Sequence, residues 1–153
     1  MSPRAEAGGP VNRLTTDRVA CWLLKSSLVP QLLSVGWWPG EELLLDRCVR
    51  PSYRLGLMAA GHPCVLWVSG RDRPGVHAVG TVVGDVADHG GQPEVPVRLR
   101  LLAEPIPRSE LASDPAFRDA EVLRMPAGSN PSWLTAAQYA AVLSRVAPDD
   151  LGR

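Results

Sequence analysis

The sequence contains almost no lysine. Of its sixteen Lys and Arg residues one is Lys25, and the remaining fifteen are arginines; sixteen Asp and Glu residues balance them. The formal net charge at pH 7 is therefore zero. A neutral chain does not coat nucleic acid by bulk charge, although it can still read nucleic acid through a local basic face.

Long hydrophobic runs are also missing. No apolar stretch is long enough to span a membrane, and the N-terminus lacks a signal-peptide core. The three cysteines, Cys21, Cys48 and Cys64, are odd in number and have no CxxC spacing. We therefore expect reduced thiols in a cytoplasmic protein that has no membrane partner.

Signatures of common catalytic and cofactor sites do not occur. None of the three histidines has a familiar zinc-ligand spacing, and the chain has no GxSxG motif, phosphate loop or dinucleotide fingerprint. We predict no metal and no cofactor, and we favour a protein that is not an enzyme. An enzymatic alternative stays open, in which Lys25 acts as a base with Asp85 or Glu94 as its acidic partner.

The length and composition predict one domain. A chain of 153 residues with 45% hydrophobic residues can form a real core. The first seventeen residues are rich in Gly, Pro and Arg and lack periodicity, which is typical of a flexible tail. We expect a tail over residues 1–17, a single domain over 18–146 and a second tail over 147–153, in a monomer.

The stretch from residue 20 to 38, ACWLLKSSLVPQLLSVGWW, organises the rest of the prediction. Val19 to Leu24 is apolar and typical of a buried strand. Ser26 or Ser27 can cap a helix that follows, and Pro30 fits its first turn. We expect the packed face of that helix to consist of Leu28, Leu32 and Val35.

Three further strands follow. Residues 64–69 and 76–86 are apolar and typical of buried strands, and residues 95–101 alternate between apolar and polar types. Residues 41–49 fit a helix or a strand equally well, and residues 87–93 are predicted as a loop rich in turns. Gly80 and Gly84 suggest bends or a close backbone approach in the third strand. Four strands with bending glycines favour a small curved sheet or barrel.

Helix signals cluster in the second half of the chain, after one short helix capped by Ser52. Thr135 and Gln138 form a capping-box pattern for a final helix. We predict a short strand over residues 122–125 and a loop over 128–134.

The order of these features resembles an EVE domain of the PUA-like superfamily and, more distantly, a YTH domain. The resemblance covers about residues 18–144. It is carried by CWLLKSS with the later GWW, by AAGHPCVLWVSG with GVHAVGTVVGDV, and by VPVRLRLLAEPIPRSEL with the terminal RMPAGSNPSWLTAAQYAAVL. It implies an α+β fold in which short helices flank a PUA-like curved sheet or β-barrel.

The resemblance also implies a function. Such domains read methylated or hydroxymethylated cytosine or methyladenine in DNA or RNA, and we expect a partner of this kind, with a separate nuclease or modification enzyme as a further partner. Lys25, Ser26 and Ser27 stand where YTH domains have Lys-Ser-Asn, and Glu94-Val95 stands where they have a second cage tryptophan. A pocket with one aromatic face for stacking and a polar floor therefore fits this sequence better than a full aromatic cage for methyladenine.

The predicted site has two parts. The base pocket consists of Trp22, Lys25, Ser26, Ser27, Trp37, Trp38, Trp67, Ser69, Gly70 and Asn130. The contacts to backbone phosphates come from Arg47, Arg50, Arg54, Arg71 and Arg73. Each residue also has a purely structural interpretation, and for Trp22 and Trp67, which lie inside apolar strands, a core position is favoured.

Two other functions stay open. One is a small hydrolase, similar to the ASCH group, that acts on a modified nucleoside or RNA. The other is a scaffold whose pocket is vestigial and filled by the protein's own side chains.

Overall fold

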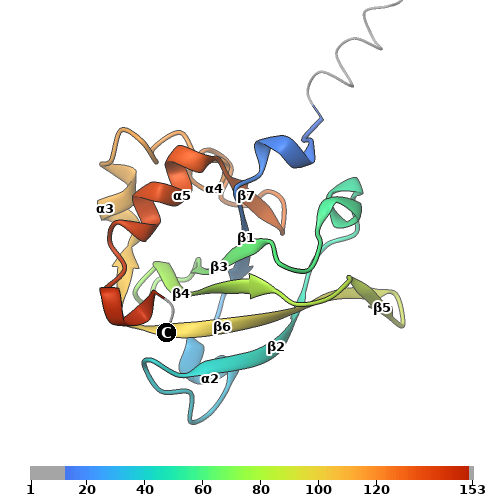
Figure 1. Cartoon of the computed structure of the whole chain (residues 1–153), viewed down its shortest axis with the longest axis horizontal. Coiled ribbons are helices and arrows are strands. Elements are labelled where there is room, and N and C mark those ends of the chain that lie inside the picture. The colour runs from blue at the N-terminus through green and yellow to red at the C-terminus, as the bar shows by residue number, and fades with distance from the viewer. Residues whose placement is uncertain (1–12, 152–153) are drawn as a thin grey trace, which may run out of the picture.

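Seven strands form one mixed sheet within the residues that the computed structural model describes, 13–151 (Figure 1). The strands are β1 (Cys21–Ser26), β2 (Glu42–Cys48), β3 (Pro63–Val68), β4 (Gly75–Val82), β5 (Ala87–His89), β6 (Gln92–Pro107) and β7 (Ser132–Leu134). Their order is β2-β6-β4-β3-β1-β7, and β5 pairs with β6. The first strand of the chain is thus surrounded by later ones, parallel to β3 and antiparallel to β7.

Short helices surround this sheet. The α-helices are α2 (Pro30–Leu33), α3 (Arg108–Ala112), α4 (Glu121–Arg124) and α5 (Ala136–Leu143), and the 3-10 helices are η1 (Thr16–Arg18), η2 (Tyr53–Leu57) and η3 (Pro148–Asp150). Helices α3, α4 and α5 lie together over one side of the sheet, and α2 lies on the other (Figure 1). The predicted α+β class with short flanking helices is confirmed.

Two hydrophobic clusters fill the two sides of the sheet, because the central strands are buried on both faces. Along β1, Cys21 and Leu23 pack into the cluster under the helices, whereas Trp22 and Leu24 pack into the inner cluster. The apolar residues of the alternating part of β6, such as Leu99, all point into the inner cluster. The period-two pattern predicted this strand correctly.

Side chains close the sheet where its hydrogen-bond ladder stops. Strands β2 and β7 are the two ends of the strand order. Arg47 of β2 donates from Nη2 to the Lys25 carbonyl oxygen at 3.4 Å, and Asn130 donates from Nδ2 to the Cys48 carbonyl oxygen at 3.2 Å. The Arg50 amide donates to the Asn130 carbonyl oxygen at 2.8 Å. We call the place where these bonds connect the two ends of the sheet the seam. It consists of Lys25, Arg47, Cys48, Arg50 and Asn130, and it gives the curved sheet its barrel-like form.

The helix predicted after Lys25-Ser26-Ser27 is reduced to the single turn α2. Its N-cap is Val29, without a side-chain bond, because the Ser26 hydroxyl instead bonds both backbone polar groups of Leu28. The predicted packed face is wrong, since its three members are the exposed residues Leu28, Leu32 and Val35. One turn is too short to present a continuous face, and its buried residue is Pro30.

Several shorter segments also differ from the prediction. Residues 41–49, left undecided, contain β2, and residues 87–93 contain β5 in a hairpin with β6. The predicted strand over 122–125 is wrong, because α4 occupies this segment and buries Val122. The predicted loop over 128–134 contains β7. A run of three or four apolar residues has no periodicity that separates strand from helix.

The packed structure extends into both predicted tails. Leu14 is buried and its amide donates to the Tyr53 hydroxyl at 2.7 Å. Near the other end, the carboxylate of the buried Asp150 accepts from the Ala103 amide at 3.4 Å. Residues 1–12 and 152–153 of the predicted tails lie outside the described residues.

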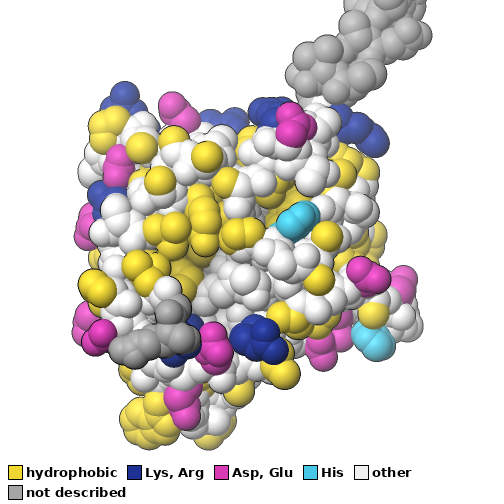
Figure 2. Space-filling view, viewed as in Figure 1, with side chains coloured by type: hydrophobic (Ala, Val, Ile, Leu, Met, Phe, Trp, Pro, Cys, Tyr) yellow, Lys and Arg dark blue, Asp and Glu magenta, His cyan; other side chains and the backbone are white. Residues whose placement is uncertain are grey.

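Local capping signals are confirmed. The Ser52 hydroxyl accepts from the Arg54 amide at the start of η2, and Thr135 and Gln138 form the expected capping box of α5. On the face shown in Figure 2, acidic and basic side chains lie around the edge, hydrophobic side chains gather in the upper and middle left of the view, and a smaller hydrophobic group lies at the lower left, over the turn between α2 and β2. Among the described residues, no helix is long and apolar enough to cross a membrane.

Candidate functional site

A polar pocket of about 180 Å³ opens beside the seam. Strands β1 and β3 are parallel, so their carboxyl ends meet at one edge of the sheet, where the Ser69 amide donates to the Ser26 carbonyl oxygen at 2.8 Å. The loop before β7 provides the facing wall. The lining residues are Lys25, Ser26, Ser27, Arg50, Ser69, Pro126, Ala127, Gly128 and Asn130.

Asn130 holds this wall against β1. Its Oδ1 accepts from the Lys25 amide at 3.1 Å, while its Nδ2 donates across the seam to the Cys48 carbonyl oxygen. Both ends of the amide are therefore used, and the side chain has one orientation. The Asn130–Pro131 peptide bond is cis.

The three serines of the site differ in what they can offer a ligand. The buried Ser26 hydroxyl is occupied by the backbone of Leu28, and the Ser69 hydroxyl donates to the Ser26 carbonyl oxygen at 3.3 Å. The exposed Ser27 hydroxyl has no hydrogen bond to any described residue. Ser27 is therefore the hydroxyl most ready to bond an incoming group.

Two cations border the pocket. Lys25 donates from Nζ to the Pro126 carbonyl oxygen at 3.2 Å. Burial lowers the pKa of Lys25, the nearby charges of Arg50 and Arg54 lower it further, and Glu121 opposes them. The Arg50 guanidinium has no ion pair or hydrogen bond to any described residue, so its charge is available to an anion.

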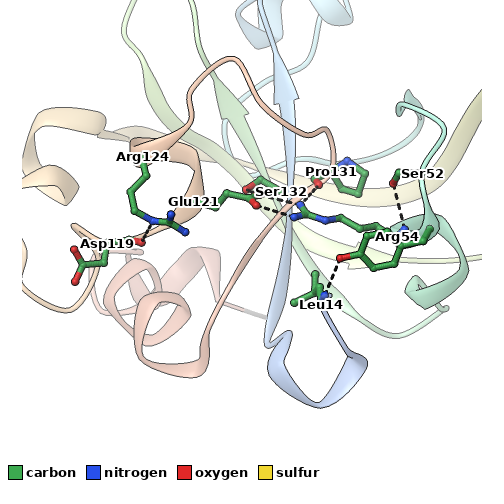
Figure 3. Close-up of polar contacts among 9 residues, drawn as sticks. Leu14, Ser52, Arg54, Asp119, Glu121, Arg124, Pro131 and Ser132 are labelled. Carbon is green, nitrogen blue, oxygen red and sulfur yellow. Dashed lines mark hydrogen bonds and ion pairs between the residues drawn. The ribbon is translucent and has the colours of Figure 1, made fainter. Parts of the chain in front are cut away.

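Arg54 serves the protein instead of a ligand. Figure 3 shows its guanidinium directed at the carboxylate of Glu121, which it meets through two hydrogen bonds of 2.7 and 2.8 Å. It also donates to the Pro131 carbonyl oxygen at 3.0 Å, and the Ser132 hydroxyl donates to Glu121 at 2.7 Å. Both terminal nitrogens of Arg54 bond groups of the protein, and Arg54 is not among the residues that line the pocket, so its contact with phosphate stays a prediction.

This network lowers the pKa of Glu121. Burial alone would raise the pKa of Glu121, but hydrogen bonds from Arg54 and Ser132, together with the charges of Arg54 and Lys25, hold it below its ordinary value. Nearby, Arg124 of α4 bonds the Asp119 carbonyl oxygen (Figure 3). Helix α4, which precedes the loop that forms one pocket wall, is thus tied to η2 by the ion pair between Glu121 and Arg54.

The other predicted phosphate contacts are spread more widely. Arg47 belongs to the seam, and its Nε is buried without a hydrogen-bond partner among the described residues. Arg73 pairs with Glu104 at 3.4 Å, and Arg71 is exposed in the same loop. Of the five arginines, the structure brings only Arg50 into the pocket.

Three predicted pocket tryptophans belong to the hydrophobic interior. Trp22 is fully buried, with Nε1 donating to Nδ1 of His62, and Trp67 stacks against Phe117 at 6.2 Å between ring centroids. Trp37 is buried, with Nε1 donating to a backbone oxygen of residue 41. The core position favoured for Trp22 and Trp67 is confirmed, and Trp37 is buried as well, so none of the three lines the pocket as the predicted base-pocket set had it.

Trp38 and Gly70 lie outside the lining residues. Trp38 is 68% exposed, and its amide donates to the Glu41 carboxylate at 2.9 Å. Gly70 borders the pocket, because a Cβ there would lie 3.1 Å from the Ser27 carbonyl oxygen. The predicted stacking face is therefore missing from the pocket itself, while its polar floor is present.

The site also contains residues that the prediction missed. Pro126, Ala127 and Gly128 line the pocket, and none of the three has a side-chain donor, so the polar groups that they offer a ligand belong to the backbone. The one available signal in the sequence was that these residues belong to the terminal segment RMPAGSNPSWLTAAQYAAVL, which is part of the resemblance to an EVE domain. Because residue type says little about an exposed carbonyl, this contribution was not visible in the sequence.

The acidic partners considered for Lys25 do not meet it in the pocket. Neither Asp85 nor Glu94 is among the lining residues, and the carboxylate that influences Lys25 is Glu121, already paired with Arg54. Among the described residues, no group of three or more His, Cys, Asp or Glu side chains is arranged to hold a metal.

Comparison with known proteins identifies the architecture. Neither a protein-family model nor a curated protein matches the chain. A hypothetical protein from Leishmania major is 19% identical, with a TM-score of 0.64 over 84% of this chain and 95% of that one. The DUF55 domain of human thymocyte nuclear protein 1 is 17% identical, with a TM-score of 0.53 over 86% and 99% of the two chains.

This chain has the EVE (DUF55) fold. The resemblance inferred from the sequence order is thereby confirmed at the level of the fold. Another structure with the same EVE fold is human THYN1 in complex with 5-methylcytosine-containing DNA, which is 17% identical with a TM-score of 0.53 over 81% of this chain and 95% of that chain. In the present EVE fold, the polar pocket lies at the seam of the barrel.

Proposed function

We propose that this EVE-fold protein is a non-enzymatic module that binds a modified nucleobase, a methylated or hydroxymethylated cytosine or a methyladenine, in the polar pocket at the seam. The observation that carries the proposal is the meeting of the free Ser27 hydroxyl, the free Arg50 guanidinium and Lys25 around one small cavity. The shared fold of a protein solved with 5-methylcytosine-containing DNA supports it.

The chemistry of the pocket fits a base with an adjacent phosphate. A base taken out of a helix loses its pairing partners, which Ser27 and the backbone of residues 126–128 can replace. Arg50 and Lys25 can hold the neighbouring phosphates through charge-assisted bonds. The cavity of about 180 Å³ is smaller than the roughly 300–1,000 Å³ typical of drug-sized ligands. A single planar base is therefore the suitable occupant.

The test is a fluorescence-anisotropy titration with labelled DNA and RNA oligonucleotides. Each carries one modified base and is matched by an unmodified oligonucleotide of the same sequence, at one fixed salt concentration. We expect one modified base to bind about tenfold more tightly than its plain counterpart, a difference of about 1.4 kcal/mol. Equal affinity for every modified and plain pair contradicts the proposal.

Two variants separate recognition of the base from attraction of the backbone. Ser27→Ala should reduce the preference for the modified base, because it removes a hydroxyl that bonds the base edge. Arg50→Ala should weaken binding of modified and plain oligonucleotides alike and lower the salt slope by about one. Arg98→Ala is the control, since Arg98 is an exposed arginine on β6, three strands from β1 in the sheet order.

A further inference from the structure

A second hollow, of about 250 Å³, lies between β4, β6 and the loop that joins β3 to β4. It shares no lining residue with the pocket at the seam. Its polar lining residues are Gln31, Asp72, Arg73 and His77, and its other lining residues are apolar. We call it the bulge hollow, because it forms where the pairing of β4 with its neighbours is interrupted.

The bulge hollow exists because His77 has no partner in either neighbouring strand. On both sides of β4 the pairing passes directly from Val76 to Ala78. On the side of β6, residues 102–105 lie between the partners of these two residues and pair with nothing in β4. Three of these four residues line the hollow. Bulges re-aim side chains and are frequent next to active sites.

Within residues 13–151, one ring nitrogen of His77 has no hydrogen-bond partner, although only 6% of the residue is exposed. The other, Nε2, lies 2.6 Å from the Arg73 carbonyl oxygen, and because a carbonyl can only accept, Nε2 carries the proton. Burial lowers the pKa of His77 in spite of this bond, so the neutral ring is favoured. Nδ1 then holds a lone pair to which an occupant of the hollow can donate.

Arg73 holds this histidine through an uncommon backbone conformation. Its φ is 54°, and no other non-glycine residue of the described chain has a positive φ. A long side chain in the left-handed region persists only where the surrounding structure holds it there. Here the conformation accompanies the bond between the Arg73 carbonyl and His77. Residues of this kind cluster at ligand-binding sites, which makes the hollow a candidate for one.

The charge that lines the bulge hollow without compensation is negative. Arg73 pairs with Glu104 at 3.4 Å, whereas Asp72 has no ion pair with any residue that the structure describes. Arg71, the other cation of the loop, is exposed and does not line the hollow. An anionic ligand would therefore meet two carboxylates. The acceptors of Asp72 and His77 instead suit a ligand that is rich in donors.

We propose that the bulge hollow binds a primary ammonium group carried by a short apolar chain. The ammonium has three donors and no acceptor, which suits Nδ1 of His77 and the Asp72 carboxylate. The chain lies against the apolar walls that Leu102 and Pro105 provide. The hollow is smaller than the roughly 300–1,000 Å³ of sites for drug-sized ligands, so its ligand has the size of an amine or an amino acid. This site is independent of the proposed nucleobase pocket.

The test follows the histidine side chains of the full-length protein by NMR while n-butylamine, an ammonium ion at neutral pH, is added to ¹⁵N-histidine-labelled protein. We expect the free protein to show His77 with its proton on Nε2, and the probe to move the Nδ1 resonance upfield. His62 and His89 are internal controls, because His62 Nδ1 already accepts from Trp22 and Ala59, and His89 is exposed on β5. Their signals should not move.

Matched probes decide which chemistry the hollow recognises. Butan-1-ol removes the charge of n-butylamine, and butyrate reverses it, so both should bind at least about fivefold more weakly. L-Norvaline is n-butylamine with an added carboxylate. Tighter binding of L-norvaline identifies the ligand as an amino acid whose carboxylate reaches Arg73, and weaker binding identifies it as a simple amine.

The variant is Asp72→Asn, which keeps the size of an exposed loop side chain and removes its charge, so the protein should melt as the wild type does. It should weaken n-butylamine about fivefold or more, whereas the control Asp85→Asn, in the exposed loop after β4, should stay within about twofold.

The inference is overturned if His77 Nδ1 does not respond to n-butylamine, or if butan-1-ol binds as tightly. Equal affinity of Asp72→Asn and wild type also overturns it. None of these results alters the oligonucleotide titrations, so the proposed function stands or fails separately.

Discussion

Two Arg–Glu pairs show how burial decides what an ion pair does. The side chains of Arg54 and Glu121 are 12% and 13% exposed and meet through two hydrogen bonds. Arg73 and Glu104 are 61% and 85% exposed and meet once, at 3.4 Å. Solvent screens the second pair, whereas breaking the first leaves a cation with little water to replace its partner.

Glu121→Gln should therefore destabilise the protein by about 2–3 kcal/mol at neutral pH, since it removes the charge that two strong hydrogen bonds from Arg54 depend on. Urea unfolding measures this difference. Glu104→Gln is the matched control and should change stability by less than about 0.5 kcal/mol. Equal effects of the two substitutions would show that burial of the Arg54 pair has no energetic consequence.

The same comparison has a predicted pH dependence. Because the native pKa of Glu121 is held below its ordinary value of 4.5, its contribution is fully present above pH 4.5 and is lost as pH falls through the native value. The stability difference between wild type and Glu121→Gln should thus shrink on acidification. A difference that is constant or grows between about pH 7 and pH 3 contradicts this assignment.

At the scale of elements, β4 and β6 approach so closely that one position admits no side chain. A Cβ on Gly80 would lie 1.8 Å from the Arg98 carbonyl oxygen, and this atom belongs to the backbone of a paired strand. The sequence prediction of a bend or close approach at Gly80 and Gly84 is confirmed for Gly80. Space, rather than backbone angle, is what requires glycine here.

Gly80→Ala should lower stability by about 3 kcal/mol, because two paired strands must separate to accommodate the methyl group. Thermal or urea unfolding is the measurement. Gly56→Ala is the control, since a Cβ at Gly56 meets nothing within 4 Å. A Gly80→Ala protein as stable as the control variant would mean that the strands separate without cost.

Strands and caps were predictable where the signal is local. Alternation along residues 95–101 predicted β6, and the Thr135–Gln138 box predicted the start of α5. The three-residue strand β7 was missed, because it exists through pairing with β1, more than 100 residues earlier. Sequence patterns describe neighbours along the chain, whereas β7 depends on neighbours in space.

The candidate site was predicted in part for the same reason. The residues after β1, Lys25 to Ser27, line the pocket as expected, because the end of a strand is a local feature. Trp22 and Trp67 alternate along strands that are buried on both faces, so their pattern does not separate core from pocket. The partner of Arg54 lies 67 residues away and has no signature in the sequence.

At the scale of the whole molecule, one amide side chain joins three parts of the barrel. Asn130, in the loop before β7, accepts from the Lys25 amide of β1 and donates to the Cys48 carbonyl oxygen of β2. No backbone ladder joins β2 to β7, the two ends of the strand order. Closure of the barrel therefore combines a side chain that also lines the pocket with the Arg47 side chain and the backbone bond from Arg50 to Asn130.

Asn130→Ala should speed hydrogen exchange of the Lys25 amide, because that donor loses its acceptor, at a cost of about 1–3 kcal/mol in stability. The Leu23 amide, in the centre of β1, should keep its protection. Asn130→Asp is the control: it retains an acceptor for Lys25 and should preserve protection there. If Lys25 exchanges equally fast in both variants, the Oδ1 contact is not what protects it.

The central place of β1 has a consequence for the order of events as the chain folds. This strand is completed by residue 26, yet its partners come from residues 63–68 and 132–134, and Asn130 reaches it across 105 residues. Contacts that close such long loops form late and slowly. During synthesis, the pocket therefore lacks the wall formed by residues 126–130 until the ribosome has released that segment. The complete pocket therefore cannot form until synthesis has passed residue 130.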